Sequence, residues 1–190
     1  MKNKAFFSLM INPFTRIAGW QAFSLGLVFV ILMGIIGTYT NVSFDGVLDV
    51  HNFQQMTFVH SFSFLAIDLF SLVLVMWITG LIISKSFRFV DILGTMTLAK
   101  APLIIMALAG YLMKSTDSAE LLKNPALFYH SAPLIIFIIL ALPILIWNIT
   151  LMYNALKISC DAKGTKLTIA FILAVIVSEI VSKIIILNTI

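Results

Sequence analysis

The sequence has little cysteine and little charge, and both shortages narrow the possible classes of protein. Cys160 is the only cysteine among 190 residues, which excludes an internal disulfide and a metal site built from several cysteines. Charged residues make up 11% of the chain, whereas soluble domains carry about 25%. The sequence also lacks a Walker loop, a GxSxG elbow and an HExxH helix. We therefore expect no catalytic residues, no cofactor site and no enzymatic activity.

What the chain has instead is long apolar runs. Hydrophobic residues make up 61% of it, and the mean hydropathy is +1.10. Five runs cover residues 17–39, 57–84, 92–113, 131–157 and 167–187. A membrane-crossing helix needs about 20 residues, and these runs are continuously apolar rather than alternating as barrel strands do. The sequence therefore predicts an all-α membrane helix bundle with five transmembrane helices, formed by residues 1–190 as one domain.

The basic residues between the runs predict the orientation. Eight of them fall on one side: Lys2, Lys4, Arg16, Lys85, Arg88, Lys157, Lys163 and Lys166. The loops on the other side carry only Lys114 and Lys123. Because basic loops stay in the cytoplasm, we expect a cytoplasmic N-terminus and a C-terminus outside. The inner face then matches anionic lipid headgroups, and no nucleic-acid-binding motif is present.

The segment before the first run combines apolar residues with two lysines. Lys2 and Lys4 precede Phe6 and Phe7, a pattern typical of a short helix lying in the membrane interface. Asn12-Pro13 should end that helix. The first run is longer than the core of a signal peptide and has no small-x-small cleavage site after it, so we expect it to stay in the protein.

Four charged residues fall inside the runs, namely Asp68, Lys100, Glu179 and Lys183. Each costs about 2.5–3.5 kcal/mol at the bilayer centre, so partners are expected. Asp68 and Lys183 each lie about 16 residues, or about 24 Å, from the inner end of their runs, which predicts a contact between them. Glu179 precedes Lys183 by one turn on the same face. Lys100 lies lower and is expected to meet Glu179 or Asn148.

This intramembrane polar network has two interpretations. Charges that balance and pair by depth can join helices to one another. Intramembrane charges also mark proton and ion paths. Prolines within the third and fourth runs (Pro102, Pro133 and Pro143) invite kinks, and we interpret these as structural features of the spans.

The three histidines all fall near the outer ends of the runs. His51, His60 and His130 share that layer with Asp45 and Asp49, and histidine with carboxylate can bind zinc. No two histidines have the i, i+4 spacing of a helical metal site. We therefore expect isolated interfacial histidines and no metal.

Two segments resemble the Yip family of membrane proteins. Residues 87–94, Phe-Arg-Phe-Val-Asp-Ile-Leu-Gly, lead into 98–103, Leu-Ala-Lys-Ala-Pro-Leu, which is similar to the family's entry into its third span. Trp147-Asn148 on the fourth run, followed by the loop 163–166, Lys-Gly-Thr-Lys, is similar to the family's closing pattern. The resemblance implies a five-span bundle with a cytosolic N-terminus.

The same resemblance carries expectations about function. Eukaryotic Yip proteins are linked to Rab-type GTPases, vesicle trafficking and membrane shaping, whereas prokaryotic members generally lack an assigned activity. Only about 16 residues precede the first run here, where eukaryotic members carry a long cytosolic region, so the prokaryotic type and the bacterial cytoplasmic membrane are expected, without GTPase binding. The family supplies no catalytic residue.

Three functional hypotheses follow from these patterns. The first is a non-enzymatic, Yip-like protein that organises the membrane or a partner complex, as a homo-oligomer or with another membrane protein. The alternative is a small transporter or channel subunit that uses Asp68, Lys100, Glu179 and Lys183. The third is a metal-dependent membrane enzyme that uses the outer histidines. Substrate, partner and oligomeric state are not specified by the sequence.

Overall fold

The computed structural model describes residues 8–52, 55–113 and 131–189, and it is almost entirely helical. The long helices are α2 (Gly19–Thr40), α3 (Phe58–Ile83), α4 (Phe89–Ala99), α5 (Ile104–Met113), α7 (Ala132–Ser159) and α8 (Thr165–Thr189). The short 3-10 helix η2 (Ala101–Leu103) joins α4 to α5, so that these form one span. The described chain therefore has five helical spans long and apolar enough to cross a membrane, which confirms the predicted helix bundle.

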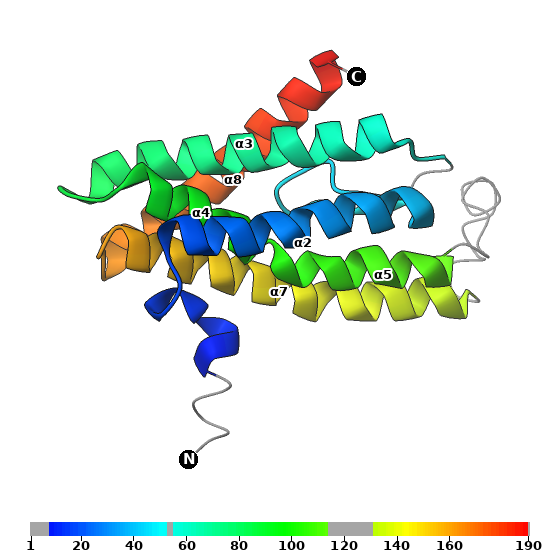
Figure 1. Ribbon diagram of the computed structural model, residues 1–190, viewed down its shortest axis with the longest axis horizontal. Coiled ribbons are helices and arrows are strands. Elements are labelled where there is room, and N and C mark those ends of the chain that lie inside the picture. Colours follow the sequence, from blue (N-terminus) through cyan, green and yellow to red (C-terminus); the bar gives the residue numbers. More distant parts are fainter. Residues whose placement is uncertain (1–7, 53–54, 114–130, 190) are drawn as a thin grey trace.

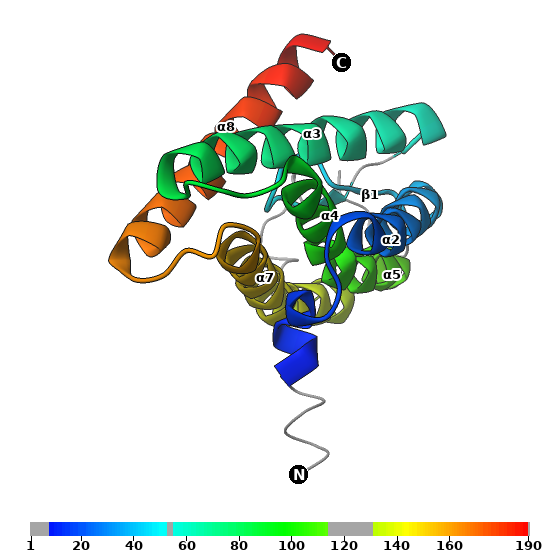
Figure 2. The same cartoon turned by 60° about the vertical axis from the view of Figure 1, so that its left-hand side comes forward.

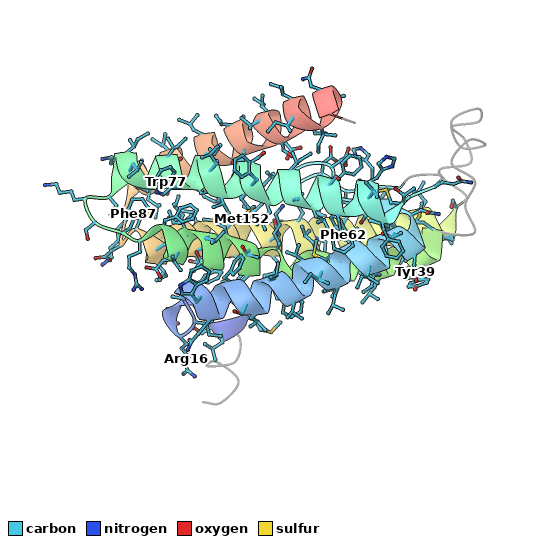
Figure 3. All side chains as sticks on the ribbon, turned by 45° about the horizontal axis from the view of Figure 1, so that its top comes forward. Arg16, Tyr39, Phe62, Trp77, Phe87 and Met152 are labelled. Carbon is cyan, nitrogen blue, oxygen red and sulfur yellow. The ribbon has the colours of Figure 1, made fainter. Side chains whose placement is uncertain are left out.

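Successive spans run in opposite directions through the bundle (Figure 1). At one end of the bundle, α2, α4 and α8 begin and α3 and α7 end, as both Figure 1 and Figure 2 show. We call this the basic end, because its described basic residues are Arg16, Lys85, Arg88, Lys157, Lys163 and Lys166. Figure 3 places Arg16, Phe87 and Trp77 toward this end and Tyr39 at the opposite one.

The third span is the central element of the bundle. In its most apolar window 72% of the residues are buried, against 17–44% for the other four spans. Small and hydroxyl-bearing residues such as Gly94, Thr97 and Ala107 allow neighbouring helices to approach it closely. By contrast, α8 packs chiefly on α3, and its C-terminal part diverges from the bundle (Figure 2).

Aromatic pairs mark both ends of the spans. Trp77 and Phe89 form an edge-to-face pair toward the basic end, with ring centroids 5.7 Å apart. Tyr39 and Phe58 form a similar pair at the other end, at 5.8 Å. Aromatic side chains concentrate where membrane proteins meet the two interfaces, so this arrangement supports a bundle that crosses a bilayer.

The segment between α2 and α3 enters the bundle instead of covering its surface. Its strands β1 (Val42–Ser43) and β2 (His51–Asn52) pair antiparallel, with Val42 opposite Asn52. Between them the chain turns inward, and the side chains of Val42, Phe44 and Val47 are at most 2% exposed. We call residues 42–52 the inserted loop. The sequence leaves residues 40–56 as a connection between the first two apolar runs, and the structure places part of this connection inside the bundle.

The N-terminal segment lies against α7. Residues 8–11 are helical, and the 3-10 helix η1 (Pro13–Thr15) follows Asn12, as the Asn-Pro pair predicts. The indole N–H of Trp147 donates to the carbonyl of Met10 at 2.9 Å, and the side-chain amide of Asn154 donates to the carbonyl of Ile11 at 3.0 Å. The first half of the predicted interfacial helix, residues 1–7, lies outside the described residues.

Two apolar clusters fill the bundle, one on either side of a polar layer. Leu72, Ala99 and Leu151 belong to the cluster nearer the basic end. Leu65, Leu103 and Ile144 belong to the other. Three polar residues lie between the two clusters. Asp68 belongs to α3, Lys100 joins α4 to η2, and Asn148 belongs to α7. These three residues, which we call the polar layer, are at most 2% exposed.

Candidate functional site

The polar layer centres on a buried ion pair. The ammonium of Lys100 donates to the Asp68 carboxylate at 2.5 Å and to the carbonyl of Val47 at 2.8 Å. Both charged side chains are at most 3% exposed. Breaking a pair of this kind is costly, because the remaining charge is left buried without compensation.

A break in the third span positions Lys100. Pro102 has no N–H for the carbonyl of Leu98, and the N–H of Leu103 bonds to the carbonyl of Lys100 at 3.0 Å instead of that of Ala99. The released carbonyl of Ala99 accepts a hydrogen bond from the side-chain amide of Asn148 at 2.9 Å. The break expected at Pro102 is thus present. The expected partners of Lys100 are wrong, since its ammonium binds Asp68 and Val47, and Asn148 binds the carbonyl of the neighbouring Ala99. Pro133 lies in the first turn of α7, and Pro143 lies within it.

Three successive residues of the inserted loop are held by three intramembrane charges. Lys100 binds the carbonyl of Val47. The Glu179 carboxylate accepts from the backbone N–H of Leu48 at 2.9 Å. Lys183 forms an ion pair with Asp49. The loop is therefore fixed to the third span and to α8 by charge-assisted hydrogen bonds, which are stronger than neutral ones.

Glu179 and Lys183 lie one turn apart on α8 and also face each other. Their charged atoms are 3.8 Å apart, in the favourable order with glutamate first. Gly46 lets the loop approach this pair, because a Cβ there would collide with the Glu179 carboxylate. The side chain of Lys183 is 40% exposed, so this outer part of the network reaches the surface of the bundle.

The predicted contact between Asp68 and Lys183 is wrong. Asp68 pairs with Lys100, and Lys183 pairs with Asp49 and Glu179; no ion pair joins Asp68 to Lys183 among the described side chains. Pairing Asp68 with Lys183 by their depth along the spans assumes that no other segment lies between α3 and α8. The inserted loop occupies that space and supplies Asp49 as a nearer carboxylate.

His51 ends the network at the surface. Its Nδ1 lies 2.8 Å from a carboxylate oxygen of Asp45 and 3.6 Å from one of Asp49. These three residues offer ligand atoms within 4.8 Å of one another, the spacing of a possible metal site. Asp49 is already paired with the ammonium of Lys183, which would repel a cation. His60 stacks on Phe64 and does not belong to this group, and His130 lies outside the described residues.

The composition of the network limits the chemistry it can perform. Its described members are the carboxylates of Asp45, Asp49, Asp68 and Glu179, the ammonium groups of Lys100 and Lys183, and the imidazole of His51. Within the described part of the chain, Oδ1 of Asp68 has no hydrogen-bond partner. The four carboxylates of the network outnumber its two ammonium groups.

Sequence reasoning identified the charged members on the spans but missed the loop as their binding partner. The backbone groups of Val47 and Leu48 carry no side-chain signal for such a role. A signal was nonetheless present, since Val42, Phe44 and Val47 are more apolar than a solvent-exposed turn requires.

Cys160, at the C-terminus of α7, is expected to react slowly with thiol reagents. Its side chain is buried, and burial raises the pKa of its thiol to about 11, so that on the order of one thiol in ten thousand is ionised at pH 7. We expect slow labelling by N-ethylmaleimide at pH 7.5 and rapid labelling after denaturation in SDS. A Lys85→Cys, Cys160→Ala variant should label rapidly in the native state, because Lys85 is exposed. Rapid native labelling of Cys160 would contradict its burial.

Comparisons of the chain with protein-family models, with curated proteins and with solved structures gave no match. The resemblance to the Yip family therefore stays a prediction from the sequence.

Proposed function

We propose that the chain is a non-enzymatic, Yip-like integral membrane protein that organises the membrane or a partner complex. One observation carries this proposal: the four intramembrane charges bind protein groups and hold the inserted loop inside the bundle. Val47, at the depth of the polar layer, is fully buried. The polar network thus has a structural role. It holds the inserted loop in the region between α3, α8 and the third span, where a substrate path would otherwise run.

The orientation and the membrane belong to the same proposal. The basic end is assigned to the cytoplasm, which places the N-terminus inside and the inserted loop toward the outer side. The bundle is assigned to the bacterial cytoplasmic membrane as part of this proposal. The basic end would then face anionic headgroups.

An assembly measurement tests this function. An organiser binds a second copy or another membrane protein, so native mass spectrometry in mild detergent should show a complex heavier than the 21.1 kDa chain. Proteoliposomes with a pH-sensitive dye inside should acidify, under an imposed potential, no faster than empty ones. The matched variant carries Asp68→Asn and Lys100→Met together, which removes both charges of the buried pair. It should keep the same assembly.

A small transporter or channel subunit is the second candidate, and a specific observation favours it. The network runs from the exposed His51 to the buried Asp68, whose Oδ1 finds no hydrogen-bond partner among the described residues. Proton flux by the wild type that is lost in a folded Asp68→Asn, Lys100→Met variant would support this candidate. The same result, with a single chain as the only species, would contradict the organising function.

A further inference from the structure

An apolar groove lies between α3 and α8 in the half of the bundle nearer the basic end. Its volume is about 330 Å³. Its lining comes from Val75, Ile78, Thr79 and Ile82 of α3 and from Ala170, Leu173, Ala174 and Val177 of α8. Ligand pockets span about 300–1,000 Å³, so this groove is large enough for a segment of one hydrocarbon chain.

The groove exists because two small side chains face α3. Ala170 and Ala174 are four residues apart and therefore share one face of α8, where each presents only a methyl group. Among the described lining residues Thr79 is the only polar one, and its hydroxyl donates to the carbonyl of Val75 at 2.9 Å. The one polar group of the described lining therefore already has a hydrogen-bond partner, and the lining suits a hydrocarbon chain.

A lysine stands at the end of the groove that opens to the basic end. The ammonium of Lys166 donates to the carbonyl of Ile82, a lining residue, at 3.3 Å. Ile82 belongs to the last turn of α3, whose carbonyls have no donors within the helix. An ammonium has three hydrogens, so Lys166 keeps two for an anion. Lys85 and Lys163, both exposed, add positive charge next to these helix ends, with Asp161 as an exposed acidic residue.

We propose that α3 and α8 form a binding site for one anionic phospholipid, with an acyl chain in the groove and the phosphate at Lys166. The inference rests on the proposed function, because it names a membrane component that an organising bundle would hold. A second copy of the chain fits the groove less well. A second copy in the same membrane orientation would bring its own positively charged basic end to the level of Lys166, so that like charges would meet.

Lipid titration of the full chain, purified and delipidated in mild detergent, tests this site. The probes are dioleoyl-phosphatidylglycerol and dioleoyl-phosphatidylcholine, which share acyl chains and differ in charge, with adducts counted by native mass spectrometry. We expect one phosphatidylglycerol per chain, bound about fivefold more tightly than phosphatidylcholine, as one lysine contact predicts. Lys166→Gln should abolish that preference. Lys157→Gln, at the same end but on α7, should keep it.

A groove-filling variant tests the acyl-chain half of the proposal. Ala174→Phe should lower the affinity for both lipids, whereas Leu142→Phe, at a 64% exposed position of α7, should leave both unchanged. Equal binding of the two lipids by the wild type, or a preference that survives Lys166→Gln, would overturn the proposal. The proposal would also be overturned if Ala174→Phe changed the mass of the assembly and left the binding of both lipids intact. Failure of the assembly test leaves these adducts in place, so that the two proposals fail separately.

Discussion

Lys100→Met should destabilise the protein more than any other single charge removal in the network. The change leaves Asp68 buried without its ammonium partner and the carbonyl of Val47 without its donor. Removing one partner of a buried pair costs about 3–5 kcal/mol. For a chain of this size, that corresponds to a fall in melting temperature of about 10 °C. The measurement is the thermal loss of the monodisperse species in mild detergent.

A half-exposed lysine of the same network serves as the control. Lys183→Met removes the ion pair with Asp49, but the Lys183 side chain is 40% exposed and the charges left behind stay near the surface. Ion pairs in such settings contribute about 0–1 kcal/mol. The melting temperature should therefore fall by only a few degrees. Equal effects of the two changes would contradict the difference in burial.

Neutralising both partners should recover most of the lost stability. In the variant with Asp68→Asn and Lys100→Met no charge remains buried at the polar layer, and replacing a buried ion pair by neutral groups is often close to neutral in stability. The inserted loop still loses the bond from Lys100 to Val47, so we expect recovery short of the wild type. A double variant as unstable as Lys100→Met alone would show that the ammonium acts through the loop and not through Asp68.

The spans could be predicted from the sequence because their signal is local. Each run is apolar over its full length, and the observed helices begin and end within three residues of the predicted limits. The break at Pro102 was predictable for the same reason, since the missing N–H is a property of one residue. The position of Asn148 opposite that break follows from depth along the spans, which sequence spacing approximates well.

The pairing of charges could not be predicted in full, because it depends on a segment whose path is not periodic. Depth matched Asp68 to Lys183, but the inserted loop brings Asp49 to Lys183 and leaves Asp68 to Lys100. Two of the loop's contacts use backbone groups, which are identical in every sequence. A periodic pattern identifies which face of a helix is buried, but it does not indicate which loop enters the bundle.

Gly26→Leu should separate α2 from α4 and prevent the bundle from packing normally. A Cβ at Gly26 would lie 2.5 Å from the backbone nitrogen of Leu98 and 2.7 Å from the carbonyl carbon of Thr97. Backbone atoms cannot rotate away as a side chain can, so the helices themselves must move. We expect a loss of about 3 kcal/mol, at the upper end of overpacking effects, seen as a lower melting temperature and a smaller folded yield.

Gly34→Ala, two turns further along α2, separates this steric effect from the ordinary preference of helices for alanine. Its Cβ would meet the ring of Phe62 at 2.8 Å, and that side chain can turn aside. Alanine favours a helix over glycine by about 1 kcal/mol, which offsets the small repacking cost, so we expect little change. Gly26→Ala gains the same preference and still clashes with the backbone of α4, and its melting temperature should fall. If the two alanine variants behaved alike, the close approach of α2 and α4 at Gly26 would not be what holds the central span in place.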